Sequence, residues 1–193
     1  MSPDIIEQVR GFILDPVETF RNARGDELGE AIKYYAVILA IYAGLTGLMT
    51  MGGFGVYLDT SGFLDTFGSV GIGTAIGVIL ATFVGEIIGL LVVTLIIHVL
   101  VALFIGGNGI EATAKALAYA STPSMLFGWI PFIGPLAFVW TVILSVIGIR
   151  EFHETTTGRA AVAVVLPVVA LAVLFVLVIA AIAAVVIAAN VAA

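Results

Sequence analysis

The chain has 193 residues, of which 62% are hydrophobic and 10% are charged, and its formal net charge at pH 7 is −6. This composition excludes a water-soluble fold, because several uncharged runs are long enough to cross the roughly 30 Å hydrocarbon core of a bilayer as helices. The negative charge argues against nucleic acid as a partner, and the absence of cysteine excludes disulfides, thiolate metal ligands and cysteine nucleophiles. We therefore expect an all-α polytopic membrane protein, since helices satisfy their own backbone hydrogen bonds in lipid.

Residues 1–32 are predicted to form a cytoplasmic or interfacial segment of two short amphipathic helices. Apolar residues at spacings of three and four line one face of the first helix, namely Ile5, Ile6, Val9, Phe12 and Ile13. The second helix is expected to begin at Pro16, with Asp15 as its cap and Glu18 completing a capping box. We expect the segment to pack under the membrane domain; membrane sensing or partner docking is the alternative.

Residues 33–193 are predicted to form one membrane domain, a bundle of five spanning helices. The expected spans cover residues 33–54, 74–106, 112–129, 134–149 and 160–189. Pro131 and Pro135 break the chain between the third and fourth spans. A polar decad, Arg150–Arg159, separates the fourth span from the fifth.

The number of spans depends on the stretch from residue 66 to residue 109, in which Glu86 is the one charged residue. Residues 66–85 could be an outer extension of the second span, a re-entrant segment or a separate span. Five spans place all seven Lys and Arg residues on the cytoplasmic side, whereas six would export Lys115, Arg150 and Arg159. We therefore predict five spans, a cytoplasmic amino terminus, an outer carboxyl terminus, and an outer loop containing Asp59 and Asp65.

Two polar residues inside the second predicted span form a candidate intramembrane site. A carboxylate within a span is costly and is a functional hypothesis by default, which singles out Glu86. The alternative is a protonated, hydrogen-bonded Glu86 or one that reaches water at the outer interface. His98 follows twelve residues later, about 18 Å along a helix, so the two side chains share a site only if the helix breaks. We expect His98 to be a packing histidine rather than a proton relay or a ligand.

The third span contains a candidate helix break, and the last polar loop contains a candidate interaction surface. Tyr119, Ser121 and Pro123 mark the break, which either packs inside the bundle or lines a cavity. The loop candidates are Arg150, Glu151, His153 and Arg159. We favour a solvated loop over a cation site built from Glu151, His153 and Glu154. An ordinary ion pair is expected between Glu111 and Lys115, which are four residues apart.

A series of short motifs is more specific than the composition. In chain order they are Pro16–Phe20, His98 with Gly106-Gly107, Ala118–Pro123, Gly128–Pro131, Trp140, Ile147–His153 and Thr155–Ala160. Their order and spacing resemble the Yip family of five-span membrane proteins, named in eukaryotes for interacting with Rab-type GTPases. The resemblance covers about residues 12–180 and is strongest over 115–165.

The resemblance implies a five-helix bundle with a cytoplasmic amino terminus. The eukaryotic members are tied to vesicle traffic between endoplasmic reticulum and Golgi, and the resemblance associates their GTPase binding with a long cytosolic domain. This chain has only about 32 residues before its first span, which makes it more similar to a prokaryotic (archaeal or bacterial) member in a cell membrane.

We expect a non-enzymatic membrane scaffold or interaction protein with no cofactor, metal or catalytic residue, because the sequence carries no hydrolase elbow, phosphate-binding loop or zinc motif. Its expected partners are membrane lipid, a protein not identified by the sequence, and a second copy of itself through small-residue faces. The alternative is a small channel or carrier for an ion or small solute that uses Glu86 and the broken third helix.

Overall fold

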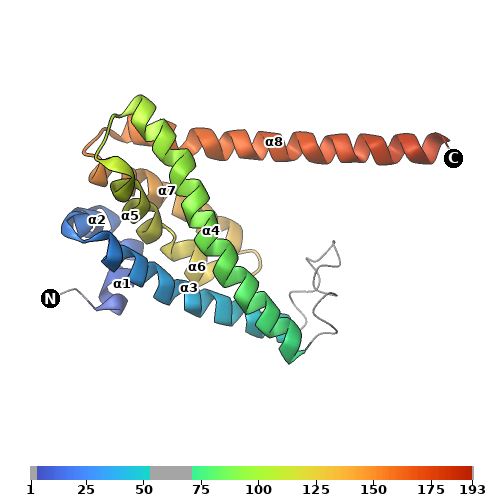
Figure 1. Ribbon diagram of the computed structural model, residues 1–193, viewed down its shortest axis with the longest axis horizontal. Helices are drawn as coiled ribbons and strands as arrows, with labels where there is room; N and C mark the ends of the chain where they lie inside the picture. The colour runs from blue at the N-terminus through green and yellow to red at the C-terminus, as the bar shows by residue number, and fades with distance from the viewer. Residues whose placement is uncertain (1–3, 53–70, 193) are drawn as a thin grey trace.

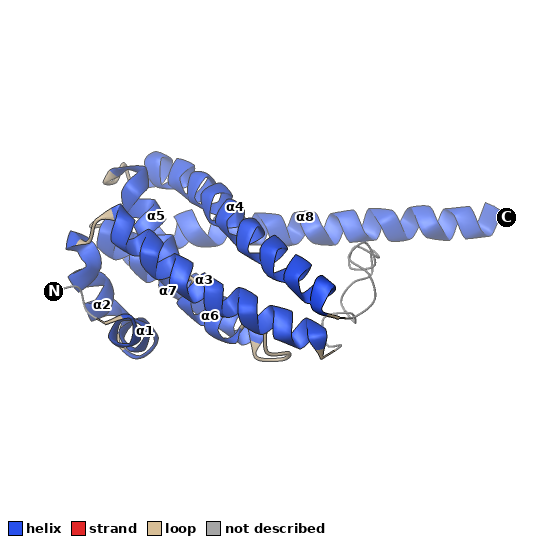
Figure 2. Cartoon of the chain, turned by 60° about the horizontal axis from the view of Figure 1, so that its bottom comes forward, coloured by secondary structure: helices blue, strands red, loops and turns tan. Residues whose placement is uncertain are grey.

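The computed structural model describes residues 4–52 and 71–192, with side chains up to residue 182, and this described part contains helices and no strands (Figures 1 and 2). In chain order the elements are α1 (Ile5–Leu14), α2 (Pro16–Asn22), the 3-10 turn η1 (Ala23–Gly25), α3 (Leu28–Met51), α4 (Ile72–Phe104), α5 (Gly109–Ala120), α6 (Thr122–Phe127), α7 (Gly134–Phe152) and α8 (Thr157–Ala192). The expected all-α fold is confirmed. The predicted outer loop with Asp59 and Asp65 lies outside the described residues.

The two long helices α3 and α4 pack against each other along the bundle (Figure 1). Their close approach depends on Gly47, where an added Cβ would overlap the Ile79 side chain. The Tyr35 hydroxyl donates a 2.9 Å hydrogen bond to the Glu86 carbonyl across this contact. α4 continues through Glu86 as one helix of 33 residues, about 50 Å long. The chain therefore does not turn at Glu86, and residues 72–85 extend the second predicted span.

The third predicted span is two helices, α5 and α6, which meet at Ser121. Pro123 lies in the first turn of α6, where its missing N–H costs no intrahelical bond. Local hydroxyl bonds stabilise the junction: Ser121 donates to the Leu117 carbonyl at 2.8 Å, and Thr122 donates to the Tyr119 carbonyl at 2.6 Å. α7 then returns alongside α5 and α6.

α1 and α2 form a hairpin at one end of the bundle, next to the first turns of α3 (Figures 1 and 2). Phe12 and Phe20 are fully buried, so the hairpin is packed into the fold. α2 begins at Pro16 as predicted, but the expected cap is wrong, because the Asp15 side chain makes no capping hydrogen bond. The Thr19 hydroxyl instead donates to the Asp15 carbonyl at 2.7 Å.

α8 is buried against the bundle at its first two turns. Ala160, Ala163 and Val164 are buried beside α4 and α7. Beyond them the helix leaves the bundle and extends away from it (Figure 1). At 36 residues it is about 54 Å long, well beyond the roughly 30 Å of a hydrocarbon core.

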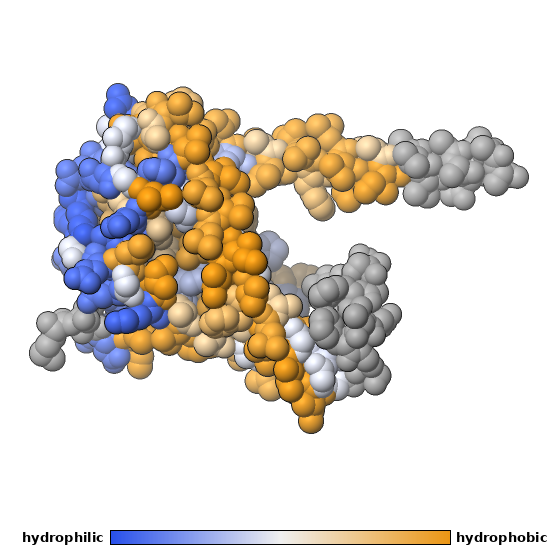
Figure 3. Space-filling view, viewed as in Figure 1, coloured by the Kyte–Doolittle hydropathy of each residue, from blue (hydrophilic) through white to orange (hydrophobic). Residues whose placement is uncertain are grey.

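Polar and apolar side chains occupy different parts of the molecule. Hydrophilic residues gather at the end that holds α1, α2 and the start of α5, while α4 and the coloured part of α8 are mainly apolar (Figure 3). Within the described residues, four helices are long and apolar enough to cross a membrane, namely α3, α4, α7 and α8. Helices that are apolar on all sides and exposed are stable in lipid rather than in water. The chain is therefore an integral membrane protein.

Candidate functional site

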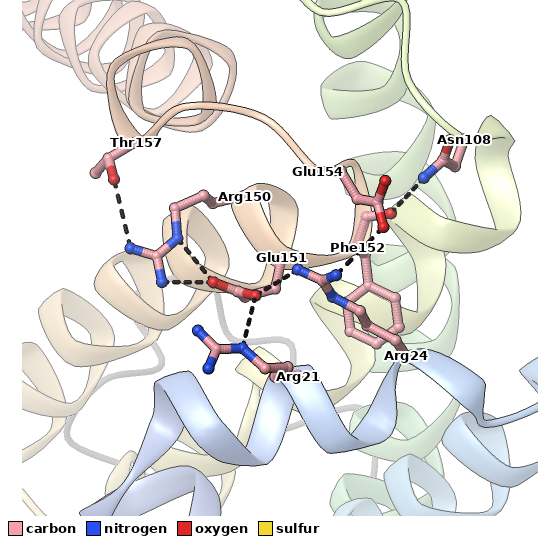
Figure 4. A network of polar contacts seen from close by, with 8 residues as sticks. All are labelled: Arg21, Arg24, Asn108, Arg150, Glu151, Phe152, Glu154 and Thr157. Carbon is pink, nitrogen blue, oxygen red and sulfur yellow. Dashed lines mark hydrogen bonds and ion pairs between the residues drawn. The ribbon is translucent and has the colours of Figure 1, made fainter.

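The polar end of the bundle is organised around one buried carboxylate, Glu151, at the last turn of α7 (Figure 4). Its side chain is 6% exposed and bonds two guanidinium groups: Arg24 Nη2 and Arg150 Nη2 each lie 2.6 Å from a carboxylate oxygen. Arg21 Nε lies 3.8 Å away, and Arg24 Nη1 also bonds the exposed Glu154 at 3.2 Å. Because Arg24 belongs to η1, this network ties the amino-terminal segment to the loop between α7 and α8.

Lys115 of α5 makes a second connection to the amino-terminal segment. Its ammonium donates to the carbonyl oxygens of Asp26 at 2.7 Å and Arg24 at 3.3 Å. It also lies 5.1 Å from the centre of the Phe152 ring, within the range of a cation–π contact. The expected ion pair with Glu111 is therefore wrong, because carbonyls far away in sequence take the ammonium protons. We call Arg24, Asp26, Lys115, Glu151 and His153 the polar hub.

A cluster of aromatic rings lies beneath the polar hub. Its members are Phe12, Phe20, Tyr34, Tyr119 and Phe152. The Phe12 ring stacks on the ring of Tyr119 with centroids 4.7 Å apart, and it lies 4.8 Å from the ring of Phe20. The Tyr119 hydroxyl donates a 2.6 Å hydrogen bond to the Asp26 carboxylate, so the cluster is linked to the hub. Five separate elements, α1, α2, α3, α5 and α7, thus meet in one core at the polar end.

A directional chain of hydrogen bonds joins His153 to His98. The backbone N–H of Asn108 donates to His153 Nδ1 at 2.9 Å, so that nitrogen is an acceptor. His153 therefore carries its proton on Nε2 and donates it to the Thr113 hydroxyl at 3.0 Å. Thr113 in turn donates to His98 Nδ1 at 3.1 Å. The Asn108 side-chain amide also donates to the Phe152 carbonyl, which holds the α4–α5 loop against the end of α7.

Two glycines make room for these contacts. A Cβ at Gly107 would overlap the imidazole of His153 at Nδ1. At Gly148, an added Cβ would lie 2.9 Å from the Phe20 ring and 3.2 Å from the Ala116 carbonyl. Both positions therefore need glycine for space, because the neighbouring groups pack directly against the backbone.

Acid is expected to destabilise the protein through His153. Burial, with a smaller contribution from the nearby His98, lowers the pKa of His153 to about 4 from its ordinary 6.5. The unfolded chain therefore binds a proton that the folded chain excludes, and stability is complete above about pH 6.5 and is lost as the pH falls towards 4. Between about pH 7.5 and pH 5 we expect a loss of about 1–2 kcal/mol.

The measurement is the thermal unfolding midpoint of the purified protein across this pH range, compared with that of His153→Gln. The variant is less stable at neutral pH, and its midpoint should change less with pH because Gln does not titrate. An equal pH dependence in both proteins would assign the titration to another group.

The intramembrane candidates Glu86 and His98 are not brought together, because both lie on the unbroken helix α4. Glu86 is half-buried and lies at the contact with α3, where its carbonyl accepts from Tyr35. His98 belongs to the histidine chain at the polar end. The two residues therefore lie in different environments and do not form one site.

The helix-break candidates Tyr119, Ser121 and Pro123 lie where α5 meets α6, and the break is filled by neighbouring side chains. Tyr119 is fully buried and Pro123 is buried. The Tyr34 hydroxyl lies 2.9 Å from the hydroxyl of Thr122, which is 1% exposed. In the structure the break therefore packs inside the bundle, which is the first of the two alternatives.

The loop candidates are divided between buried and exposed positions, so the loop is not solvated as a whole. Glu151 and His153 are each 5% exposed and serve as internal connections, whereas Arg159 is exposed. Glu151 and His153 bond different partners, and within the described residues no three His, Asp or Glu side chains gather as metal ligands.

The sequence profile of the Yip1 domain matches residues 10–189 of the 193. The chain belongs to the Yip1-domain family. Comparison with curated proteins and with solved structures finds no match. The Yip1-domain match begins before Phe12 and thus includes most of the amino-terminal hairpin, in agreement with its packing into the fold.

Several of the motifs that carried the resemblance to the Yip1 domain meet at the polar end, whereas Gly128–Pro131 lies in the turn before α7 at the opposite end. Phe20 packs on the Phe152 ring with centroids 6.2 Å apart, and Gly107 lies against His153. Sequence reasoning missed Arg24, Asp26 and Thr113 as members of the site. The position of Arg24 and Asp26 just before the first long apolar run was the one signal that could have identified them. Nothing in the sequence distinguishes Thr113 from its neighbours.

Proposed function

We propose that this Yip1-domain protein is a non-enzymatic membrane scaffold that presents its amino-terminal hairpin to a protein partner. Membership of the Yip1-domain family and the integral membrane fold support the proposal. The main supporting observation is that α1 has one buried face and one exposed apolar face. Its inner face is fixed in the aromatic cluster through Phe12, while Ile6 and Leu14 on the outer side are 73% and 70% exposed. A rigidly held helix with an exposed apolar face is suited to docking a partner.

Substitution on the exposed face of α1 tests this function without disturbing the fold. We expect Ile6→Ser and Leu14→Ser to abolish recovery of a protein partner that the intact chain captures from native membranes by cross-linking. Glu18→Gln, at an exposed position of α2, is the matched control and should retain capture. Deletion of the whole segment is unsuitable, because it removes Phe12 and Arg24 from the core. Capture by both serine variants at the level of the control would show that α1 is not the docking surface.

The alternative function, a channel or carrier that uses Glu86 and the helix break, lacks a supporting observation. The break at Thr122 is filled by Tyr34, and Glu86 lies at the contact of two packed helices. We therefore retain the scaffold as the proposed function.

We propose that the polar hub lies on the cytoplasmic side and that α5 with α6 forms the third of five spans. Arg21, Arg24, Lys115 and Arg150 all lie at the hub end, as the positive-inside rule requires of a cytoplasmic face. Both α4 and α7 end at the hub, so the chain must return across the bundle before α7 begins. α5 with α6 is the segment between them and therefore makes this crossing.

Single cysteines in this cysteine-free chain test the orientation. Phe132 in the turn before α7 is 92% exposed, and Thr156 before α8 is exposed at the opposite end. In intact cells, an impermeant thiol reagent should label Phe132→Cys and leave Thr156→Cys unlabelled until the membrane is opened. Labelling of Thr156→Cys from outside would reverse the assignment.

A further inference from the structure

The departure of α8 from the bundle leaves an apolar groove with a volume of about 560 Å³. α4, α7 and α8 form its walls, and Figure 1 shows the direction in which α8 diverges from the other helices. Its lining includes Ile97, Phe138, Ser145, Val164, Pro167 and Phe175. The groove lies on membrane-spanning segments, so its open side faces the interior of the bilayer.

Water is not a suitable occupant of this groove. The two hydroxyls in its lining already bond protein groups: Thr141 accepts the Ser124 N–H at 3.1 Å, and Ser145 donates to the Thr141 carbonyl at 2.8 Å. A buried water needs two to four polar partners, which this surface does not offer. An empty groove would forfeit the dispersion contacts of its lining. The occupant must therefore be an apolar group.

The dimensions of the groove favour a hydrocarbon chain over a protein helix. Along α8 the lining runs from Val164 to Phe175, twelve residues with a rise of about 16 Å, which is half of a roughly 30 Å hydrocarbon core. A spanning helix of another protein chain would run along the whole core, about twice the length of this lining, whereas a single acyl chain covers one leaflet. Val164 also follows the exposed Arg159 by five residues, about 7 Å, so the groove begins close beneath the polar end.

We propose that this groove binds one acyl chain of a membrane phospholipid from the leaflet that adjoins the polar hub. The bound chain takes the place of a helix neighbour for the first half of α8. It fills the space between Phe138 and Phe175 and fixes the direction in which α8 leaves the bundle. This site is independent of partner docking at α1, which lies outside the spans.

The test uses the full chain in phosphatidylcholine vesicles that contain a phosphatidylcholine with a photoactivatable diazirine in the middle of one acyl chain. Peptide mass spectrometry then maps the adducts. We expect several-fold more adduct at Leu171, which lines the groove and is 54% exposed, than at Leu91, which lies outside it on α4 and is 60% exposed. Equal yields at these two positions would show ordinary lipid contact and overturn the site.

A matched pair of variants places the effect in the groove. Ala172 lines the groove and is exposed, so Ala172→Trp should fill the space and remove the excess adduct at Leu171. Ala170→Trp, on the same helix but outside the lining, should retain it. The thermal unfolding midpoint of each variant verifies folding. Loss of the excess adduct in both variants, or its retention in Ala172→Trp, would contradict an acyl-chain site.

Discussion

Glu151→Gln is expected to destabilise the protein by about 2–3 kcal/mol. Removal of one partner from a fully buried ion pair costs about 3–5 kcal/mol. The loss should be smaller here because Arg24 and Arg150 are 37% and 26% exposed, so water can solvate both guanidinium groups after the carboxylate is lost. The variant keeps the shape of the side chain, and its effect therefore reports the charge and its bonds.

The thermal unfolding midpoint in lipid or detergent measures this effect, and Glu154→Gln provides the matched control. Glu154 bonds the same Arg24 at 3.2 Å but is 69% exposed, and an exposed pair contributes at most about 1 kcal/mol. The two substitutions thus remove the same chemical group from a buried and an exposed position. Similar midpoints for both variants would show that burial of Glu151 contributes nothing.

Phe12→Ala should have the largest effect on stability, about 3–5 kcal/mol, because the ring is fully buried and its loss leaves a cavity. The aromatic cluster loses three ring contacts at once, with Phe20, Tyr34 and Tyr119. The hairpin of α1 and α2 should then separate from the bundle while the spanning helices remain.

Limited proteolysis and thermal unfolding distinguish separation of the hairpin from unfolding of the spanning helices. We expect rapid cleavage near α1 in Phe12→Ala and little change in Leu14→Ala, because Leu14 is on the same helix but 70% exposed. Equal resistance of Phe12→Ala and the unaltered chain would mean that the hairpin does not depend on this ring.

The helices could be predicted from the sequence because each depends on local information. Long uncharged runs indicated α3, α4, α7 and α8, and prolines marked the start of α2 and the break between α5 and α6. The capping prediction at Asp15 failed although the residue types fit, because the Asp15 side chain makes no hydrogen bond to the free N–H groups of the first turn. Residue type gives the tendency to cap, and the local geometry decides whether the bond forms.

The site could be predicted only in part, because its bonds join residues far apart in the chain. Arg24 and Glu151 are 127 positions apart, and no periodicity connects them. Polar loops are usually solvated, which led to the expectation of an exposed Glu151 and His153. Glu151 is buried against the amino-terminal segment, and His153 is buried against the α4–α5 loop and the start of α5. Composition and spacing do not reveal either arrangement. The motif glycines were informative, since Gly107 and Gly148 lie directly against these contacts.

The long separation between the two halves of the hub also sets an order of assembly during synthesis. Arg24 leaves the ribosome 127 residues before Glu151, an interval of about 6–25 s at 5–20 residues per second. Throughout that interval Phe12 and Phe20 have no Phe152 to pack against, and for the first 95 residues of it they have no Tyr119 either, so the membrane surface is the available apolar environment. The hairpin therefore docks late, after α7 has been inserted, and its docking marks the completion of the fold.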